Sequence, residues 1–235
     1  MTINTEDLLG SILDSLSRVE YINPDDIPNI DLYMDQVTTF MDKRLRATTR
    51  NPGEDKVLTK TMINNYAKND LLPPPIKKKY SKEHMLLLVF IYYYKNILSI
   101  SDIQTLLKPV TDKFFMANGD FKLEDVYKEV FAMEPSQMEL LKRDVTEKYK
   151  QAEQTFGEAP EKDREFLKMF SFIALLSFDV YVKKMLIEKL VDGLRDKETQ
   201  TESTAEEKKD KKEEKKEEKK EKDKKLEKQT EKQEK

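Results

Sequence analysis

The chain has 235 residues, of which 38% are charged and 37% hydrophobic, with 43 basic residues against 46 acidic ones. It contains no cysteine and one histidine, His84, which excludes disulfide frameworks, cysteine-based metal centres, thiol nucleophiles and two-histidine metal sites. No basic-then-apolar run opens the chain, so we expect no secretory signal and a cytoplasmic location. No glycine-rich phosphate motif occurs either. We therefore expect that the protein is not an enzyme and that it binds no cofactor and no metal.

The charge is distributed unevenly along the chain. Residues 197–235 hold 15 Lys and 14 acidic residues, so we expect this tail to be disordered or a frayed, solvent-exposed helix. Residues 1–42 hold nine acidic residues and one basic residue, whereas residues 43–82 hold eleven basic and three acidic residues. A basic cluster in an acidic chain is a candidate nucleic-acid footprint, since each phosphate that it neutralises releases counterions. A solvated surface that is merely basic is the alternative.

Capping residues and apolar periodicity predict a series of helices. In chain order these lie over residues 5–19, 31–45, 59–69, 82–96, 99–107, 123–133, 135–154 and 160–194. The expected caps are Thr5, Asp31, Thr59, Ser81 and Ser99, and Pro109 is expected to end the fifth helix. No convincing run alternates apolar and polar residues as a half-buried strand would, so the predicted fold class is mainly α.

Two of these helices are unusually apolar. The helix over 82–96 is expected at the centre of the core, with His84 hydrogen-bonded or at the solvent edge in its first turn. The apolar stretch at 170–182 is shorter than the ~20 residues that span a bilayer, so we expect a buried helix and no membrane contact.

The helix over 160–194 carries apolar residues at alternating spacings of four and three. The positions are Met169, Ile173, Leu176, Val180, Lys183, Ile187, Leu190 and Leu194, seven of them apolar. This pattern is typical of a seam between two helices. Packing within one chain and a homodimer through 160–194 both remain open.

The basic segment contains one short helix with a polar side. Apolar residues of the helix at 59–69 are expected to face inward, which leaves Lys60, Thr61, Asn64, Asn65 and Lys68 outward. Asn can bridge an adenine edge, and Lys and Thr reach phosphates or base edges. A basic loop at 76–80 follows. A short recognition helix before a basic loop is the layout of a winged helix-turn-helix.

Residues 57–107 resemble the DNA-binding domain of MerR-type regulators. The matching features are Tyr66, Leu71-Leu72-Pro73, Lys77–Lys79, Tyr80-Ser81 and Ser99–Leu107. The resemblance implies that Lys60, Thr61, Asn64 and Asn65 face DNA and that Lys77, Lys78, Lys79 and Tyr80 form a wing. It leaves open whether Tyr66 touches the DNA backbone or packs inside. The stretch LYMDQVTTFMDKRL and the segments after it are more closely similar, over roughly 25–190, to the bacterial family named domain of unknown function 1836.

The predicted organisation has four parts. These are an N-terminal helix and acidic linker over 1–28, a MerR-like winged-helix domain over 29–108, a C-terminal helical domain over 109–195 and the tail over 196–235. We expect a bacterial DNA-binding transcriptional regulator whose partner is double-stranded DNA. The alternative is a protein-interaction module that has the winged-helix shape without DNA readout. The long interhelix loop at 46–56 and the acidic N-terminal segment favour that alternative.

Overall fold

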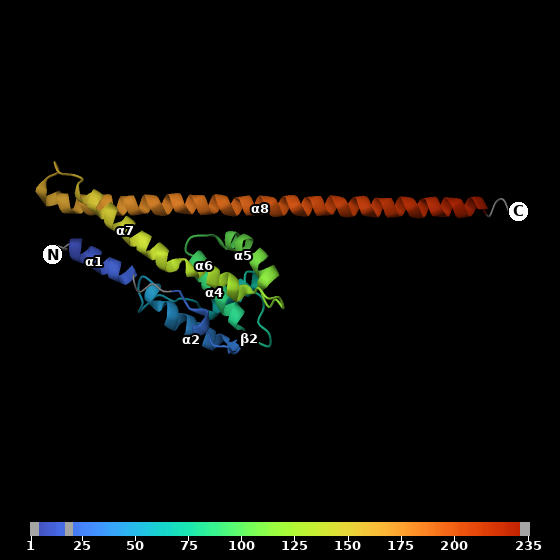
Figure 1. The fold of residues 1–235 in the computed structure, drawn as a ribbon, viewed down its shortest axis with the longest axis horizontal. Helices are drawn as coiled ribbons and strands as arrows, with labels where there is room; N and C mark the ends of the chain where they lie inside the picture. Colours follow the sequence, from blue (N-terminus) through green and yellow to red (C-terminus); the bar gives the residue numbers. More distant parts are fainter. Residues whose placement is uncertain (1–4, 17–20, 231–235) are drawn as a thin grey trace. The chain divides into compact units, whose positions relative to one another are not determined.

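A computed structural model of the chain describes residues 5–16 and 21–230, and side chains over 9–14 and 21–197. Its helices are α1 (Thr5–Leu16), α2 (Met34–Leu45), α3 (Lys60–Lys68), α4 (Lys82–Tyr94), α5 (Ile100–Phe114), α6 (Leu123–Ala132), α7 (Glu134–Glu153) and α8 (Glu161–Thr230) (Figure 1). The other elements described are the single-turn helices η1 (Pro24–Asp26) and η2 (Arg46–Thr48) and the strands β1 (Leu32–Tyr33) and β2 (Lys79–Tyr80). The mainly α fold class is confirmed.

The chain divides into two compact units at Glu188 and Lys189. The second unit is the C-terminal part of α8, whose backbone is helical as far as Thr230. The charged tail, expected to be disordered or a frayed helix, is therefore helical up to that residue. The expected end of the first helix, at 17–19, lies outside the described residues.

The start of α2 differs from the prediction. Asp31 does not cap this helix, because the next two residues form β1 and α2 begins at Met34. Gln36 satisfies the helix start instead: its Oε1 accepts the backbone N–H of Tyr33 at 2.9 Å. A two-residue strand is too short to show alternation, so the sequence pattern did not reveal β1 or its partner β2.

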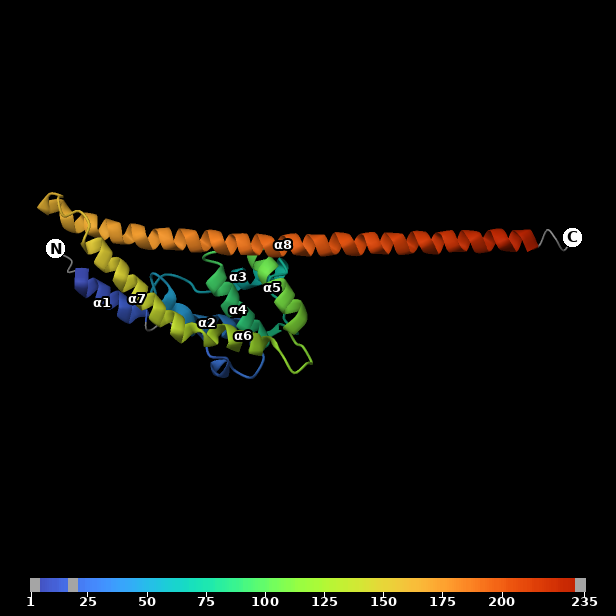
Figure 2. The same cartoon turned by 45° about the horizontal axis from the view of Figure 1, so that its top comes forward.

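The core of the first unit is built around α4. Every residue of this helix from His84 to Tyr92 is buried, and α2, α3, α5 and α6 lie around it (Figure 2). A helix that is apolar on all sides has to be covered on all sides, which confirms the central position predicted for it. Ser81 stands at its N-cap as expected.

Pro109 does not end α5, which runs on to Phe114. A proline inside a helix removes one backbone donor and costs roughly 3 kcal/mol. Ile103 and Leu107 are buried just before the proline, and α5 also packs on α6. Tertiary contacts therefore hold the helical path through a residue that would break an isolated helix.

The long loop between α2 and α3 is fastened to α4. The Thr48 hydroxyl donates to the Leu45 carbonyl at 2.7 Å and lies 2.6 Å from the Tyr92 hydroxyl. Further along, Lys95 Nζ donates to the Val57 carbonyl at 2.7 Å. The start of α3 is thus held in place although the loop is long.

A second apolar cluster joins α1, α7 and α8. Val145 and Ala152 of α7 pack with Phe172 of α8, and Leu9 and Leu13 of α1 pack against them. Ion pairs also connect α7 to α8: Lys148 Nζ lies 2.7 Å from Asp179 Oδ2, and Lys168 Nζ lies 3.0 Å from Glu153 Oε2.

This packing buries only some of the residues of the helix seam predicted over 160–194. Met169 and Leu176 lie in the cluster within the chain, whereas Ile173 and Val180 are exposed. Packing within the chain accordingly accounts for one side of the seam and leaves the other side uncovered.

Candidate nucleic-acid interface

The helix α3 has one buried and one exposed side. The Thr59 hydroxyl caps it as predicted by accepting the backbone N–H of Met62 at 3.1 Å. Ile63 and Tyr66 are buried, and burial raises the pKa of the Tyr66 hydroxyl. Tyr66 therefore packs inside. The five outward residues expected from the sequence are all exposed: Lys60, Thr61, Asn64, Asn65 and Lys68.

The exposed side of α3 is largely free of intramolecular bonds. Lys60 forms an ion pair with Asp35 of α2. Among the described residues, no hydrogen bond or ion pair occupies the side chains of Asn64, Asn65 or Lys68. These side chains keep their donors and acceptors available for a ligand.

Lysines form the tip of a tight turn before β2. Ile76 and Lys79 exchange two backbone hydrogen bonds, of 3.1 and 2.9 Å, and between them Lys77 and Lys78 have φ angles of 50° and 64°. Two successive positive φ angles define the turn that normally takes Asn-Gly. Lysine pays roughly 1–2 kcal/mol for each left-handed position. Both tip lysines are exposed.

The turn and the start of α3 meet at the junction of β1 and α2. Tyr33 of β1 pairs with Lys79 of β2, and Lys79 Nζ lies 5.1 Å from the centroid of the Tyr33 ring. Two residues further on, Asp35 binds Lys60 at the start of α3. The structure thus places the predicted helix and the predicted wing beside one short segment.

Sequence reasoning missed the two residues of that segment that contact the basic side chains, Tyr33 and Asp35. Both belong to the acidic N-terminal stretch, far from the basic segment along the chain. The pairing of β1 with β2 brings them there, and a local sequence pattern does not reveal a pairing between Tyr33 and Lys79, which are 46 positions apart.

The structure removes Tyr80 from the residues that the sequence predicted to contact DNA. Its side chain is 2% exposed, and its ring stands edge-on to His84 with centroids 5.5 Å apart. Burial raises the pKa of its hydroxyl. Strand alternation turns Tyr80 into the core while its neighbour Lys79 points to the surface, so Tyr80 is not available for a phosphate.

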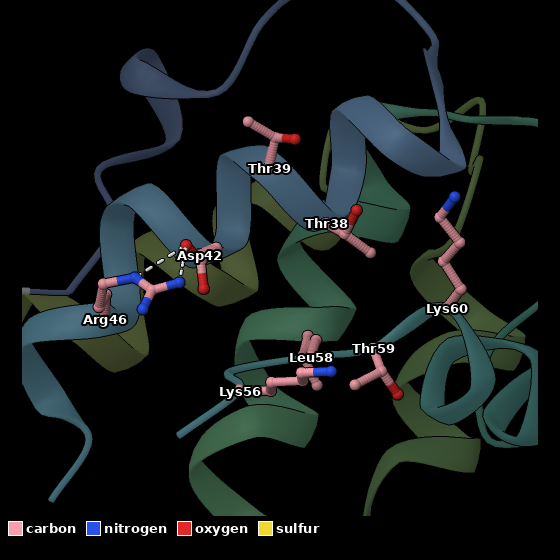
Figure 3. A pocket seen from close by; sticks show the side chains of 8 residues that line it. All are labelled: Thr38, Thr39, Asp42, Arg46, Lys56, Leu58, Thr59 and Lys60. Carbon is pink, nitrogen blue, oxygen red and sulfur yellow. Dashed lines mark hydrogen bonds and ion pairs between the residues drawn. The ribbon is translucent and has the colours of Figure 1, made fainter. Parts of the chain in front are cut away.

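A polar cavity of about 400 Å³ lies between α2 and the start of α3 (Figure 3). Its lining residues are Thr38, Thr39, Asp42, Arg46, Lys56, Leu58, Thr59 and Lys60. Arg46 points at Asp42, and its Nε donates to Asp42 Oδ2 at 2.9 Å. Lys60 is likewise paired with Asp35, so two of the three cations that line the cavity already have an acidic partner.

His84 is a structural residue at the start of α4. Its side chain is 1% exposed, which places it away from the solvent edge, and its Nδ1 accepts the backbone N–H of Ser81 at 3.0 Å. In the part of the chain that the structure describes, no three His, Cys, Asp or Glu side chains are grouped to hold a metal ion. Within that same part, no helix has the length and apolar character needed to cross a membrane.

Comparison with known proteins identifies the domain that carries these features. The family model described as "Domain of unknown function (DUF1836)" matches residues 22–130. Searches among curated proteins and among solved structures gave no match. The matched segment contains β1, the lysine turn and the helices from α2 to α5, together with most of α6. Over residues 22–130, the chain is therefore similar to the DUF1836 family.

Proposed function

We propose that this protein is a DNA-binding transcriptional regulator that contacts a duplex with α3 and with the turn at Ile76–Lys79. The observation that carries the proposal is the turn itself. Lys77 and Lys78 occupy left-handed positions that favour Asn and Gly. Backbone strain is retained where the surrounding structure supports it and where function requires the side chain. Two exposed positive charges at a rigid tip suit the phosphates of a nucleic acid.

The exposed side of α3 supports the same function. Its free amides, Asn64 and Asn65, have the donor and acceptor pair that recognises an adenine edge in the major groove. Lys60 and Lys68 stand at the two ends of the helix, where they reach the phosphates that flank a groove. Thr61 adds a hydroxyl on the same side.

The order of elements is a further support. The chain forms β1, then α2, then α3 with its exposed polar side, and then the basic turn, whose strand β2 pairs with β1. This order follows the layout expected from the likeness to MerR-type regulators. The loop at 46–59 is longer than the tight turn of those proteins, but its bonds to α4 hold α3 against the core. The homodimer expected through 160–194 belongs to the same proposal, because dimeric regulators read paired half-sites.

Fluorescence anisotropy of the full chain with labelled random-sequence duplexes tests the proposal. We expect binding at low salt whose logarithm falls linearly with the logarithm of salt concentration. The double variant K77A/K78A should bind all duplexes more weakly, and its salt slope should be smaller by about 2, which corresponds to two lost phosphate contacts.

The matched control is K150A/K162A, which removes two exposed lysines from α7 and α8. This control has the same net charge as K77A/K78A and should bind duplexes as tightly as the wild type does. Absence of duplex binding at low salt would overturn the proposal. Equal losses in the two variants would show that binding depends on net charge and not on the turn.

The second candidate is a protein-interaction module with the winged-helix shape. Exposed apolar side chains beside the lysines favour it: Tyr33 and Ile76 are each 54% exposed. Aromatic and apolar groups surrounded by charge are typical of protein interfaces. A partner that is captured equally well by wild type and by K77A/K78A, and is lost in Y33A/I76A, would select this function over the first.

A further inference from the structure

The helix α8 presents an apolar face to solvent on the side opposite its packed side. Phe172, Leu175 and Leu176 belong to the cluster with α7 and α1. About half a turn around the helix lies a set of exposed residues that we call the outer face. Its members are Phe166, Phe170, Ala174, Phe178 and Tyr181.

The outer face is large for a surface that stays in water. Phe166 is 70% exposed and Phe178 is 66% exposed. An aromatic side chain has on the order of 200 Å² to bury, so the four rings expose roughly 500 Å² per copy and roughly 1,000 Å² in two copies. Contiguous apolar patches of this size mark interaction sites, and the area reaches that of a specific interface between proteins.

We infer that the outer face binds the outer face of a second copy of this chain, with the two α8 helices antiparallel and crossing at Ala174. The charges at the ends of the face decide the direction. Asp163 precedes the aromatic residues and Lys184 follows them, and both are exposed. Parallel helices would place Asp163 on Asp163 and Lys184 on Lys184, whereas antiparallel helices bring each Asp163 to the partner's Lys184.

The aromatic residues fit the same arrangement. Phe170 and Phe178 lie four residues before and four residues after Ala174, so an antiparallel crossing there places each Phe170 on the partner's Phe178. Phe166 then meets the partner's Tyr181. Within each copy, Phe166 and Phe170 already contact each other with ring centroids 6.5 Å apart. The small side chain of Ala174 lets the helices approach closely at the crossing.

This dimer rests on the homodimer part of the proposed function and does not depend on duplex binding. The face lies outside residues 22–130, the segment that matches the family. Loss of the dimer and loss of DNA binding are therefore separate results. Solution mass and cross-linking measure the dimer, and the anisotropy of K77A/K78A with labelled duplexes measures DNA binding.

Cross-linking decides the direction of the helices, because the chain has no cysteine of its own. A174C in the full chain should form a covalent dimer with a short bis-maleimide. D163C should not, because eleven residues on each side of the crossing separate the two thiols by about 33 Å. Efficient cross-linking of D163C would overturn the antiparallel arrangement, and failure of both variants would overturn the crossing at Ala174.

Sedimentation equilibrium measures the contribution of the face. We expect the wild type to be a dimer at micromolar concentrations and F170E/F178E to be a monomer with the same helical circular dichroism. The control I30E introduces the same kind of change at a residue that is 67% exposed outside the face, and it should remain a dimer. A monomeric wild type, or a dimeric F170E/F178E, would overturn the inference.

A charge exchange tests the end contacts independently. D163K should weaken the dimer, since it places lysine against the partner's Lys184, and D163K/K184D should restore it. A double variant that dimerises no better than D163K would contradict the pairing of these two positions.

Discussion

The imidazole of His84 closes the N-terminus of α4 onto Ser81. Its Nδ1 accepts the backbone N–H of Ser81 at 3.0 Å and lies 2.8 Å from the Ser81 hydroxyl. Three residues after an N-cap, this bond is normally made by Glu or Gln. The ring is buried between Tyr80 and Phe115, both of which it contacts edge-on. An accepting Nδ1 is unprotonated, so the fold requires neutral His84.

This requirement predicts a stability that depends on pH. Burial lowers the pKa of His84 below its usual 6.5, with the carbonyls of Pro74 and Pro73 and the charge of Asp31 opposing the shift in part. Below pH 6.5 the unfolded chain binds a proton that the folded chain does not, so the free energy of unfolding should fall as the pH drops from 6.5 toward the folded pKa. Urea titrations between pH 7.5 and 5.5 measure this fall.

The control for this titration is H84Q, because Gln keeps the acceptor for the Ser81 N–H and does not titrate. The difference in unfolding free energy between wild type and H84Q should shrink as the pH falls. A difference that stays constant across this range would show that other groups cause the pH dependence.

The turn at Ile76–Lys79 predicts that stability and binding change in opposite directions. K77N/K78G replaces the two left-handed lysines with residues that adopt positive φ easily. It should raise the free energy of unfolding by about 1–2 kcal/mol while it weakens duplex binding. K77A/K78A removes the same charges and keeps the strained backbone, so it should lose binding without the gain in stability. A K77N/K78G protein no more stable than K77A/K78A would contradict the strain.

Asp35 should limit nucleic-acid binding by holding Lys60. D35N releases the lysine and removes a negative charge beside the turn. We expect tighter duplex binding and a salt slope that is larger by about 1, for one additional phosphate contact. D112N breaks an ion pair with Lys108 on α5 and changes the net charge equally. If both variants gain the same affinity, the effect is one of overall charge and Lys60 has no particular role.

One buried hydrogen bond ties the two ends of the DUF1836 segment together. The Tyr127 hydroxyl donates to the Ile22 carbonyl at 2.7 Å, and both residues are buried. Y127F leaves that carbonyl without its donor, which should lower the free energy of unfolding by about 1–2 kcal/mol. Y33F removes a hydroxyl from an exposed tyrosine and should change it by less than about 0.5 kcal/mol. Urea unfolding of the two variants makes the comparison.

Much of the local structure follows from short stretches of sequence. Thr59 and Ser99 cap their helices through their own hydroxyls, as expected, and the apolar run after Ser81 forms the buried α4. The exposed side of α3 was also predictable, because a helix of known register has a known outward side. These signals act within one or two helical turns, so they can be recognised in the sequence without knowledge of the tertiary structure.

Contacts between distant segments were beyond the reach of such signals. Tyr80 looked like part of a basic wing, and it is buried because β2 pairs with β1 and turns it into the core. Pro109 looked like a helix end, and tertiary packing carries α5 past it. Each outcome depends on packing against a segment many residues away, and the free energy of that packing outweighs the local conformational preference.

Composition and periodicity are properties of neighbouring residues, and they indicate a mainly helical protein with an acidic N-terminal segment, a basic segment next to it and a charged tail. Which of those charged side chains lie together depends on the fold. It joined Lys79 to Tyr33 and Lys60 to Asp35, and it left one side of α8 uncovered over Phe166–Tyr181. Burial and strand pairing are set by the fold as a whole, since apolar area leaves water wherever the chain can bring it together.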